Sequence, residues 1–340
     1  MLKEKLVKFI FAHPIFLDIS KNILSNKYIV NSNLYKTIVL NKAKKLDNSG
    51  NKYQTIFIET TLTCNSRCVF CYHHKKVLTG TMTMDLFKKI IDDSYQNGIK
   101  NAILSVYGEP LVDKYFFERI KYLTKKGMTY GFISNGSLLT PAKTDKLLSL
   151  PGLNFINFSV NGYATKIYEK MMVGLKRDVS YKNILYFLKM KEKLKPEILV
   201  NNSTVKNNIN EKDFPSFFKY WSRRPGVNQV MPIELRRLMG DEEYNGELGS
   251  LGPMNQKNNW LSPCSQIWSS IVVYYDGKVT VCCDDLDLRR LIVGDFTKQT
   301  FQQIVSGNKL KKLKKIHLCN QRKDHPVCGK CYRNSVWFGQ

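Results

Sequence analysis

The middle of the chain alternates between short apolar runs typical of strands and longer stretches with helical spacing. In the first helical stretch, Thr83 is suited to cap the N-terminus, and Leu86, Phe87 and Ile90 fall on one side. Repeated strand–helix units of this kind predict an α/β fold with a parallel, barrel-like sheet and right-handed crossovers. The expected strands are 55–60, 102–106, 130–134, 155–159, 197–205 and about 229–235, and the expected helices are 83–97, 113–126, a short one after Pro141, 163–194 with a break near Gly174, and 211–222.

The last third of the chain has a different pattern. Residues 239–262 are rich in Gly, Asn and Ser with little periodicity, which indicates a linker or a covering loop. Two apolar runs then flank Asp276-Gly277, which predicts a two-residue β-hairpin, and a helix is expected near 300–315. The expected parts are a basic helical extension (1–50), the barrel (51–238), the linker (239–262) and a small α+β domain (263–340).

Nine cysteines fall into two groups separated by almost two hundred residues without any. The first group is Cys64, Cys68 and Cys71, and the second contains Cys264, Cys282, Cys283, Cys319, Cys328 and Cys331. An odd number of cysteines in tight groups favours metal sites in a reducing cytoplasm over a disulfide framework.

The first cysteine group has the spacing C-x-x-x-C-x-x-C on a loop after the first expected strand. Three thiolates so spaced can bind three irons of a [4Fe–4S] cluster and leave the fourth iron open for chemistry. A zinc knuckle is the alternative, but zinc sites favour paired C-x-x-C sets. His73 and His74 follow this loop, and we expect them to be exposed.

This loop resembles that of the radical S-adenosylmethionine (SAM) superfamily, in which the third cysteine follows an aromatic residue that lies beside the adenine, as Phe70 precedes Cys71 here. The resemblance implies a partial (β/α)6 barrel. It also implies that SAM chelates the open iron and that its reductive cleavage yields a 5′-deoxyadenosyl radical, which takes a hydrogen atom from the substrate.

Polar motifs at the expected strand ends extend the resemblance, because ligands of such folds sit at the carboxyl ends of the strands. The resemblance implies SAM contacts for each of them, although an Asp is usual where Asn161 stands. They are Gly108-Glu109-Pro110 after the second strand, Ser134-Asn135-Gly136 after the third, Ser159 and Asn161 after the fourth, and Asn201 and Ser203 on the fifth.

The second cysteine group resembles the C-terminal SPASM domain and its short form, the twitch domain, which carry auxiliary [4Fe–4S] clusters. The resemblance assigns Cys264, Cys282, Cys328 and Cys331 to one auxiliary cluster. No cysteine follows Cys331, so ligands for a second auxiliary cluster are not expected. A zinc site from the same four cysteines is the alternative, and Cys319 could replace one ligand.

An auxiliary cluster closed by four cysteines suits electron transfer, so the expected reaction is a two-electron oxidation of a sugar, cyclitol or other polar metabolite. The cysteine layout resembles that of 2-deoxy-scyllo-inosamine dehydrogenase. Candidates for proton removal or substrate anchoring are Glu234, Arg236 and Arg237, at the end of the sixth strand. The expected electron donor is a flavodoxin or a ferredoxin-type protein. The alternatives are modification of a ribosomally made peptide and a non-catalytic metal-binding scaffold.

The net charge of +25 could attract a polyanion such as RNA, but Lys and Asn are abundant along the whole chain, so we do not expect a nucleic-acid partner. Residues 5–19 are apolar but short, and they are interrupted by Lys8, His13, Pro14 and Asp18. Neither a signal peptide nor a transmembrane segment is therefore expected, and the expected location is the cytoplasm.

Overall fold

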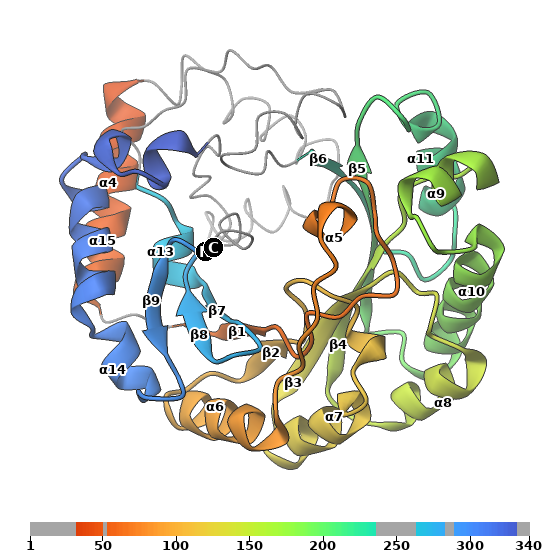
Figure 1. The fold of residues 1–340 in the computed structure, drawn as a ribbon, viewed down its shortest axis with the longest axis horizontal. Helices are drawn as coiled ribbons and strands as arrows, with labels where there is room; N and C mark the ends of the chain where they lie inside the picture. Colours follow the sequence, from red (N-terminus) through yellow and green to blue (C-terminus); the bar gives the residue numbers. More distant parts are fainter. Residues whose placement is uncertain (1–31, 50–52, 236–262, 283–288, 332–340) are drawn as a thin grey trace, which may run out of the picture. The chain divides into compact units, whose positions relative to one another are not determined.

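The structure is a computed structural model that describes residues 32–49, 53–235, 263–282 and 289–331 (Figure 1). These residues form two compact units. The described part of the first unit comprises residues 32–49, 263–268 and 311–331, and that of the second comprises 53–235, 269–282 and 289–310. The expected linker at 239–262 lies outside the described residues.

The second unit is built on a sheet with the strand order β6-β5-β4-β3-β2-β1-β7-β8-β9. Neighbours from β6 to β7 are parallel, and the β7–β8 and β8–β9 pairs are antiparallel. The predicted α/β fold is therefore confirmed, and the barrel is not closed, because β6 and β9 are edges of the sheet. The first six strands are β1 (Thr55–Ile58), β2 (Asn101–Ile103), β3 (Thr129–Ser134), β4 (Leu153–Ser159), β5 (Leu199–Lys206) and β6 (Gln229–Glu234).

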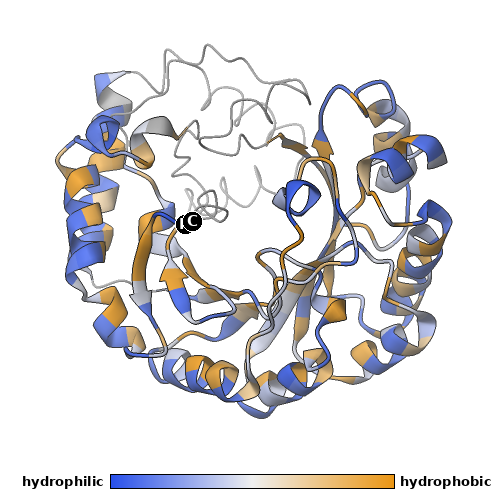
Figure 2. Ribbon diagram, in the orientation of Figure 1, coloured by the Kyte–Doolittle hydropathy of each residue, from blue (hydrophilic) through white to orange (hydrophobic). Residues whose placement is uncertain are grey.

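Amphipathic helices follow the parallel strands and lie along the outer side of the sheet in Figure 1. Figure 2 shows hydrophobic and hydrophilic residues on each of them. Thr83 caps α6 as predicted, since its hydroxyl accepts a hydrogen bond from the backbone N–H of Leu86. The helices are α6 (Met84–Gln96), α7 (Phe116–Lys125), α8 (Pro141–Ser149), α9 (Thr165–Met171), α10 (Arg177–Leu194) and α11 (Phe214–Ser222).

The helix expected from residue 113 begins later, at Phe116. A separate 3-10 turn, η1 (Pro110–Val112), comes first. The carboxylate of Asp113 then accepts hydrogen bonds from the backbone N–H of Tyr115 at 2.9 Å and from Nε of Arg119 at 2.7 Å. Asp113 is thus used to hold the buried Arg119 side chain, which also donates to the backbone oxygen of Met82.

The predicted hairpin is present as β7 (Ile271–Val273) and β8 (Lys278–Thr280), and β9 (Ile292–Asp295) and α14 (Phe301–Val305) follow it. Its connection is longer than the predicted two residues. The backbone N–H of Gly277 bonds to the oxygen of Tyr274, and Gly277 has φ +86°, which a glycine adopts without strain. The sequence did not indicate that β7 pairs with β1, so that the hairpin extends the barrel sheet.

The described part of the first unit contains α4 (Asn33–Asn48), most of α13 (Gln266–Ser269), most of α15 (Asn308–Leu318) and the short turns η2 (Arg322–Asp324) and η3 (Cys328–Lys330). Asp47 of α4 accepts hydrogen bonds from Nε1 of Trp268 at 3.1 Å and from Nζ of Lys314 at 3.3 Å. Among the described helices, none has the length and apolar character needed to cross a bilayer.

Candidate active site

The strand register places the candidate residues of β4 and β5 on one face of the sheet. Asn157 is in register with Asn201, and Ser159 with Ser203. Residues in register on neighbouring parallel strands face the same side, and side chains two apart on one strand do so as well. The side chain of Asn157 donates a hydrogen bond to Ser203 Oγ at 2.8 Å, as a shared face requires. We call this face, which continues through Ile133 of β3, the inner face.

The three-cysteine loop begins six residues after β1, and all three thiols are half-buried. The loop turns tightly between its second and third cysteines, where the backbone N–H of Cys71 bonds to the oxygen of Cys68 at 2.9 Å. Ser66 contacts the sulfurs of the first and second cysteines. Its backbone N–H donates to Cys64 Sγ at 3.4 Å, and its hydroxyl lies 3.2 Å from Cys68 Sγ. Phe70 lies half-buried in the turn before Cys71.

The outer part of this loop is fastened to the segment after α9. The backbone N–H of Arg67 donates to the oxygen of Val173 at 2.8 Å, and that of Val69 to the oxygen of Met171 at 3.0 Å. The hydroxyl of Ser66 also donates to the oxygen of Val173 at 3.1 Å. These bonds hold the loop in place without using the cysteine side chains.

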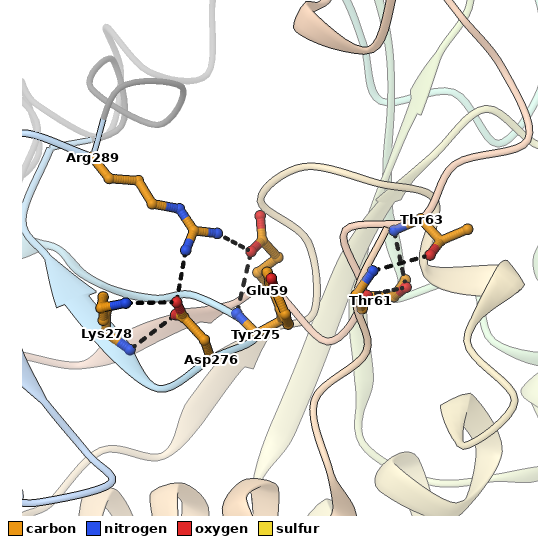
Figure 3. A network of polar contacts seen from close by, with 8 residues as sticks. Glu59, Thr61, Thr63, Tyr275, Asp276, Lys278 and Arg289 are labelled. Atoms are coloured by element: carbon orange, nitrogen blue, oxygen red, sulfur yellow. Dashed lines mark hydrogen bonds and ion pairs between the residues drawn. The ribbon is translucent and has the colours of Figure 1, made fainter. Parts of the chain in front are cut away.

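The base of the loop is closed by a short bridge to the segment before α6. Thr61 pairs with Thr81, and the backbone N–H of Leu62 donates to the oxygen of Gly80 at 2.8 Å. The hydroxyl of Thr61 accepts from the backbone N–H of Thr63 at 3.1 Å (Figure 3). The cysteines therefore lie on a loop that is pinned at both ends.

Gly108 of the Gly-Glu-Pro motif packs directly against the base of the loop. Its φ is +71°, and a Cβ atom at this position would lie 2.3 Å from the backbone oxygen of Thr61 and 2.9 Å from that of Thr63. The next residue, Glu109, donates its backbone N–H to the oxygen of Thr63 at 3.0 Å. Only glycine fits a contact of this kind between two backbones.

The buried carboxylate of Glu109 joins this motif to the Ser134-Asn135 turn. Oε1 accepts from the hydroxyl of Ser134 at 2.8 Å and from the backbone N–H of Leu111 at 3.2 Å, and Oε2 accepts from the backbone N–H of Asn135 at 2.8 Å. Burial raises the pKa of Glu109 to about 7, although all three donors favour the ionised form.

Asn135 continues this network to the cysteine loop. Its Nδ2 donates to Oδ1 of Asn65 at 2.9 Å, and Nδ2 of Asn65 donates to the hydroxyl of Ser137 at 2.9 Å. Asn65 stands inside the cysteine motif, directly after Cys64. The loop, the Gly-Glu-Pro motif and the Ser-Asn-Gly turn thus form one connected cradle, as expected from their order along the chain.

Asn161 is completely buried, and its side chain is used within the protein. Its Oδ1 accepts from the backbone N–H of Val205 at 2.7 Å, and its Nδ2 donates to Ser159 Oγ at 3.2 Å and lies 3.0 Å from Met172 Sδ. An Asp here would point a buried charge at the thioether sulfur, which explains in physical terms why an amide suits this chain. The SAM contact of Asn161 stays a prediction.

The donor set of the loop fits an iron–sulfur cluster. No group of three or more His, Cys, Asp and Glu side chains in the described ranges has the arrangement of a single-ion site. Each cysteine of a [4Fe–4S] cluster, however, binds a different iron, so its ligands need not converge on one point. Burial raises the pKa of the Cys64 thiol to about 11 and also raises that of Cys68. A cluster bound here would therefore have to supply the positive charge that stabilises the thiolates.

Three residues were predicted for proton removal or substrate anchoring. Glu234 is the last residue of β6, in register with Lys206, whereas Arg236 and Arg237 lie outside the described residues. The expected exposure of His73 is wrong. Its side chain is buried and lies edge-on to the ring of Tyr107, with ring centroids 6.4 Å apart, and burial lowers its pKa. His74 is exposed, as expected.

The cysteines predicted to hold the auxiliary cluster are divided between the two units: Cys264, Cys328 and Cys331 belong to the first and Cys282 to the second. Within the first unit, Cys328 and Cys331 are buried and joined by a backbone bond of 3.3 Å. Cys319 is exposed, and Cys283 lies outside the described residues.

Sequence reasoning missed two parts of the site. Asn65 and Ser137 complete the cradle, and their positions beside Cys64 and Asn135 were the signal available for them. A second network, formed by Glu59, Asp276 and Arg289, joins the end of β1 to the β7–β8 hairpin (Figure 3). Glu59 lies more than two hundred residues from Asp276 and Arg289 in the sequence, and no motif marks the three residues.

The family follows from two matches. Residues 58–220 match the model of the radical SAM superfamily, and residues 264–332 match the model of an iron–sulfur cluster-binding domain, SPASM. The chain is thus a member of the radical SAM superfamily with a C-terminal SPASM domain, a combination that uses a SAM-binding [4Fe–4S] cluster, SAM and auxiliary iron–sulfur clusters.

Curated relatives include the tungsten-containing aldehyde ferredoxin oxidoreductase cofactor-modifying protein of Pyrococcus furiosus, 29% identical over 59% of this chain and 58% of the relative. The S-adenosylmethionine-dependent nucleotide dehydratase of Selenomonas ruminantium is 26% identical over 45% of this chain and 56% of the relative. The chain thus spans less than two thirds of the length of either relative.

Solved structures share the fold at low identity. BtrN in complex with AdoMet and 2-DOIA has a TM-score of 0.55 at 17% identity and covers 84% of this chain and 95% of its own. SuiB of Streptococcus suis bound to S-adenosylmethionine has a TM-score of 0.62 at 11% identity, covering 98% and 88%. The structure anSMEcpe with bound AdoMet and Cp18Cys peptide has a TM-score of 0.57 at 18% identity, covering 82% and 85%.

Proposed function

We propose that this protein is a radical SAM oxidoreductase that dehydrogenates a hydroxyl-bearing polar metabolite, such as a sugar or a cyclitol. The observation that carries the proposal is the cradle: a loop with three thiols, pinned at both ends, lies against the glycine of one strand end and is hydrogen-bonded to the asparagine of the next. Three thiols leave one iron of a [4Fe–4S] cluster open, and SAM bound there supplies a 5′-deoxyadenosyl radical.

The residues of the cradle have separate tasks in this proposal. Cys64, Cys68 and Cys71 hold the cluster, and Phe70 lies beside the adenine. The Gly108–Pro110 segment meets the amino group of SAM with its backbone, because Gly108 allows close approach and Glu109 fixes the turn. Ser134 and Asn135 keep this turn and the cysteine loop in register.

The inner face supplies the remaining polar contacts in this proposal. Asn201 and Ser159 are half-buried on that face, where they can meet the ribose and the carboxylate of SAM. Ser203 is buried and accepts from Asn157, so its role is to orient Asn157 beside them.

The oxidation removes one hydrogen atom, one proton and one electron from a carbinol group and leaves a carbonyl. The hydrogen atom goes to the 5′-deoxyadenosyl group, and the proton goes to a protein base, for which Glu234 remains our candidate. Arg236 and Arg237 stay protonated, so they remain candidates for substrate anchoring. The electron needs an acceptor, for which we propose the auxiliary cluster held by Cys264, Cys282, Cys328 and Cys331. A flavodoxin or ferredoxin-type protein in a reducing cytoplasm would supply the electron that starts the reaction.

The test is an anaerobic reconstitution of the wild type and of a variant with Cys64, Cys68 and Cys71 all changed to Ala. We expect about eight irons in the wild type and about four in the variant, with matching sulfide, and no cleavage of SAM by the variant. A wild-type count of about four that vanishes in the variant would leave the second cysteine group without a cluster and remove the electron acceptor. Equal iron in both proteins would contradict the assignment of the loop.

Modification of a peptide is the second candidate, because two fold neighbours were solved with peptides: SuiB bound to the precursor peptide SuiA, and anSMEcpe with the Cp18Cys peptide. The two candidates are separated by the fate of deuterium. Deuterium from a carbinol carbon of a cyclitol should enter 5′-deoxyadenosine if our proposal holds, and deuterium from a peptide Cα should enter it under the alternative.

A further inference from the structure

The second polar network lies at the carboxyl end of β1, on the inner face. Phe57 of β1 is in register with Ile103, Ile103 with Gly131, and Gly131 with Phe155. Glu59 follows Phe57 by two residues and therefore points to the same side as Phe57, the side that carries Asn157 two residues beyond Phe155. Glu59 thus shares a face of the sheet with the polar residues proposed to meet SAM.

Arg289 is held in place by two carboxylates. One Nη atom lies 2.8 Å from Oδ2 of Asp276, and the other lies 3.3 Å from Oε2 of Glu59 (Figure 3). The guanidinium also lies over the ring of Tyr274, with its Cζ 4.2 Å from the ring centroid, and 5.4 Å from that of Tyr275. Such a guanidinium is preorganised, because its partners come from β1 and from the hairpin.

The backbone of Arg289 is strained. Its φ is +48°, in the left-handed region that residues with a side chain rarely adopt. Strain of this kind persists where the surroundings fix it, and it is frequent at binding sites. The Arg289 side chain is 25% exposed, whereas that of Glu59 is fully buried. The network therefore presents Arg289, and not its carboxylate partner, to solvent.

The charge of the network indicates what Arg289 can bind. Within the described part of the chain, two of the five N–H groups of the guanidinium contact carboxylates, which leaves three donors there. Lys278 also contacts Asp276, at 3.1 Å, so the charges of the two acidic and two basic side chains cancel above about pH 7, where Glu59 is ionised. An arginine that is already neutralised gains little from a phosphate or carboxylate, but it still donates hydrogen bonds to an uncharged oxygen.

We propose that Arg289 anchors the substrate by donating hydrogen bonds to a hydroxyl or carbonyl oxygen of an uncharged group, with Glu59 and Asp276 as its positioning residues. This inference rests on the proposed function, because it assigns the substrate oxygen to a residue of the same inner face. It selects neutral sugars and cyclitols over their phosphate esters.

The pH dependence of Glu59 supports the arrangement. Burial raises the pKa of Glu59 to about 7, against the lowering effects of the Tyr275 backbone N–H and of Arg289. The other groups that face it are Asp276, which raises the pKa, and the backbone N–H of Tyr107, which lowers it. Protonation of Glu59 below about pH 7 removes its ion pair with Arg289, so the hold on the guanidinium weakens as the pH falls.

The experiment measures binding of unreacted ligands by saturation-transfer NMR to the anaerobically reconstituted protein with SAM. The probes are neutral rings (myo-inositol, scyllo-inositol, glucose and galactose) and the phosphate esters of inositol and glucose. We compare wild type, Arg289→Ala, Arg289→Lys and the matched control Arg290→Ala, which changes the exposed neighbouring arginine. Iron content and the thermal unfolding midpoint report whether each variant is folded.

We expect wild type to bind at least one neutral ring in preference to its phosphate ester. Arg289→Ala should weaken that binding by about tenfold or more. Arg289→Lys should bind better than Arg289→Ala but more weakly than wild type, because a lysine lacks the planar guanidinium group and its paired N–H donors. Arg290→Ala should bind as wild type does. Binding by wild type should weaken from pH 8 to pH 6, and Glu59→Gln should remove that dependence, which a merely structural role would not do.

The two proposals fail in different ways. If wild type binds no neutral ring, the proposed substrate class is wrong, and the anchor falls with it. If wild type binds a neutral ring and folded Arg289→Ala binds it equally well, the anchor alone is wrong. Preference of wild type for the phosphate esters would overturn the neutral-ligand assignment while leaving dehydrogenation of a sugar possible.

Discussion

Two buried glutamates lie at the ends of neighbouring strands, and they are used in opposite ways. Burial raises the pKa of each to about 7. The partners of Glu109 are Leu111, Ser134 and Asn135, all within 26 residues, and they use both carboxylate oxygens. Oε2 of Glu59 accepts hydrogen bonds from residues 216 and 230 positions away, and the backbone N–H of Tyr107 also faces the carboxylate. Its Oε1 has no hydrogen-bond partner among the residues that the structure describes.

This difference separates a structural carboxylate from one that can serve a ligand site. Every group that donates a hydrogen bond to Glu109 belongs to the cradle, so both carboxylate oxygens are used to hold the turn in its conformation. Glu59 is only half used, and its contact is with a partly exposed arginine that has further donors. Substitution of Glu109 or of its neighbours should therefore lower the stability of the fold. Substitution of Glu59 should affect stability less and ligand binding more.

The largest effect is expected at the glycine that precedes Glu109. Gly108→Ala should lower the free energy of unfolding by at least about 3 kcal/mol and abolish SAM binding, because the new Cβ would lie 2.3 Å from a backbone oxygen. Chemical denaturation and equilibrium dialysis with SAM measure the two effects.

Gly127→Ala is the matched control for this substitution. Gly127 has φ +72°, against +71° for Gly108, but nothing lies within 4 Å of its Cβ position. The control should therefore show the conformational cost alone, about 1 kcal/mol, and leave SAM binding unchanged. Equal destabilisation by both substitutions would show that the contact with the cysteine loop does not matter.

A smaller effect is expected when Glu109 is replaced by Gln. The amide nitrogen must face a backbone N–H, either that of Asn135 or that of Leu111, so one buried donor loses its acceptor. We expect the free energy of unfolding at pH 7 to fall by about 2 kcal/mol and the affinity for SAM to fall with it. Glu59→Gln should cost less at the same pH, since its amide nitrogen can take the position that has no partner. The reverse order in urea denaturation would contradict our distinction between the two carboxylates.

The same difference explains how much the sequence could predict. The six parallel strands, the Thr83 cap and the Gly108-Glu109-Pro110 and Ser134-Asn135 turns depend on residues close in the chain, where apolar periodicity and turn chemistry act. The grouping of the turns followed from their common place at the carboxyl ends of the strands. The assignment to the radical SAM superfamily rested on these local motifs, and the match of residues 58–220 with the model of that superfamily confirms it.

The pairing of strands that lie far apart in the chain could not be predicted from the sequence. Nothing local in Ile271–Val273 indicates that this strand pairs with β1, since any short apolar strand could add to that edge. The pairing is what brings the hairpin and Arg289 to Glu59. His73 was expected to be exposed because its neighbours are polar, but packing against Tyr107 depends on a strand end more than thirty residues away.

The most diagnostic effect is the pH dependence that Glu59 gives to stability. Its pKa is 4.5 in the reference state and about 7 in the folded protein, so between these values the folded state binds more protons than the unfolded state. Stability therefore falls as the pH rises through this window, by up to about 3 kcal/mol from this residue. Glu59→Gln cannot titrate, so its stability relative to wild type should rise by that amount from pH 4.5 to pH 7.5 in urea denaturation. Glu118→Gln, an exposed control on α7, should run parallel to wild type. Parallel curves for Glu59→Gln and wild type would mean that Glu59 is no less solvated than in the unfolded chain, and they would contradict the raised pKa that its burial implies.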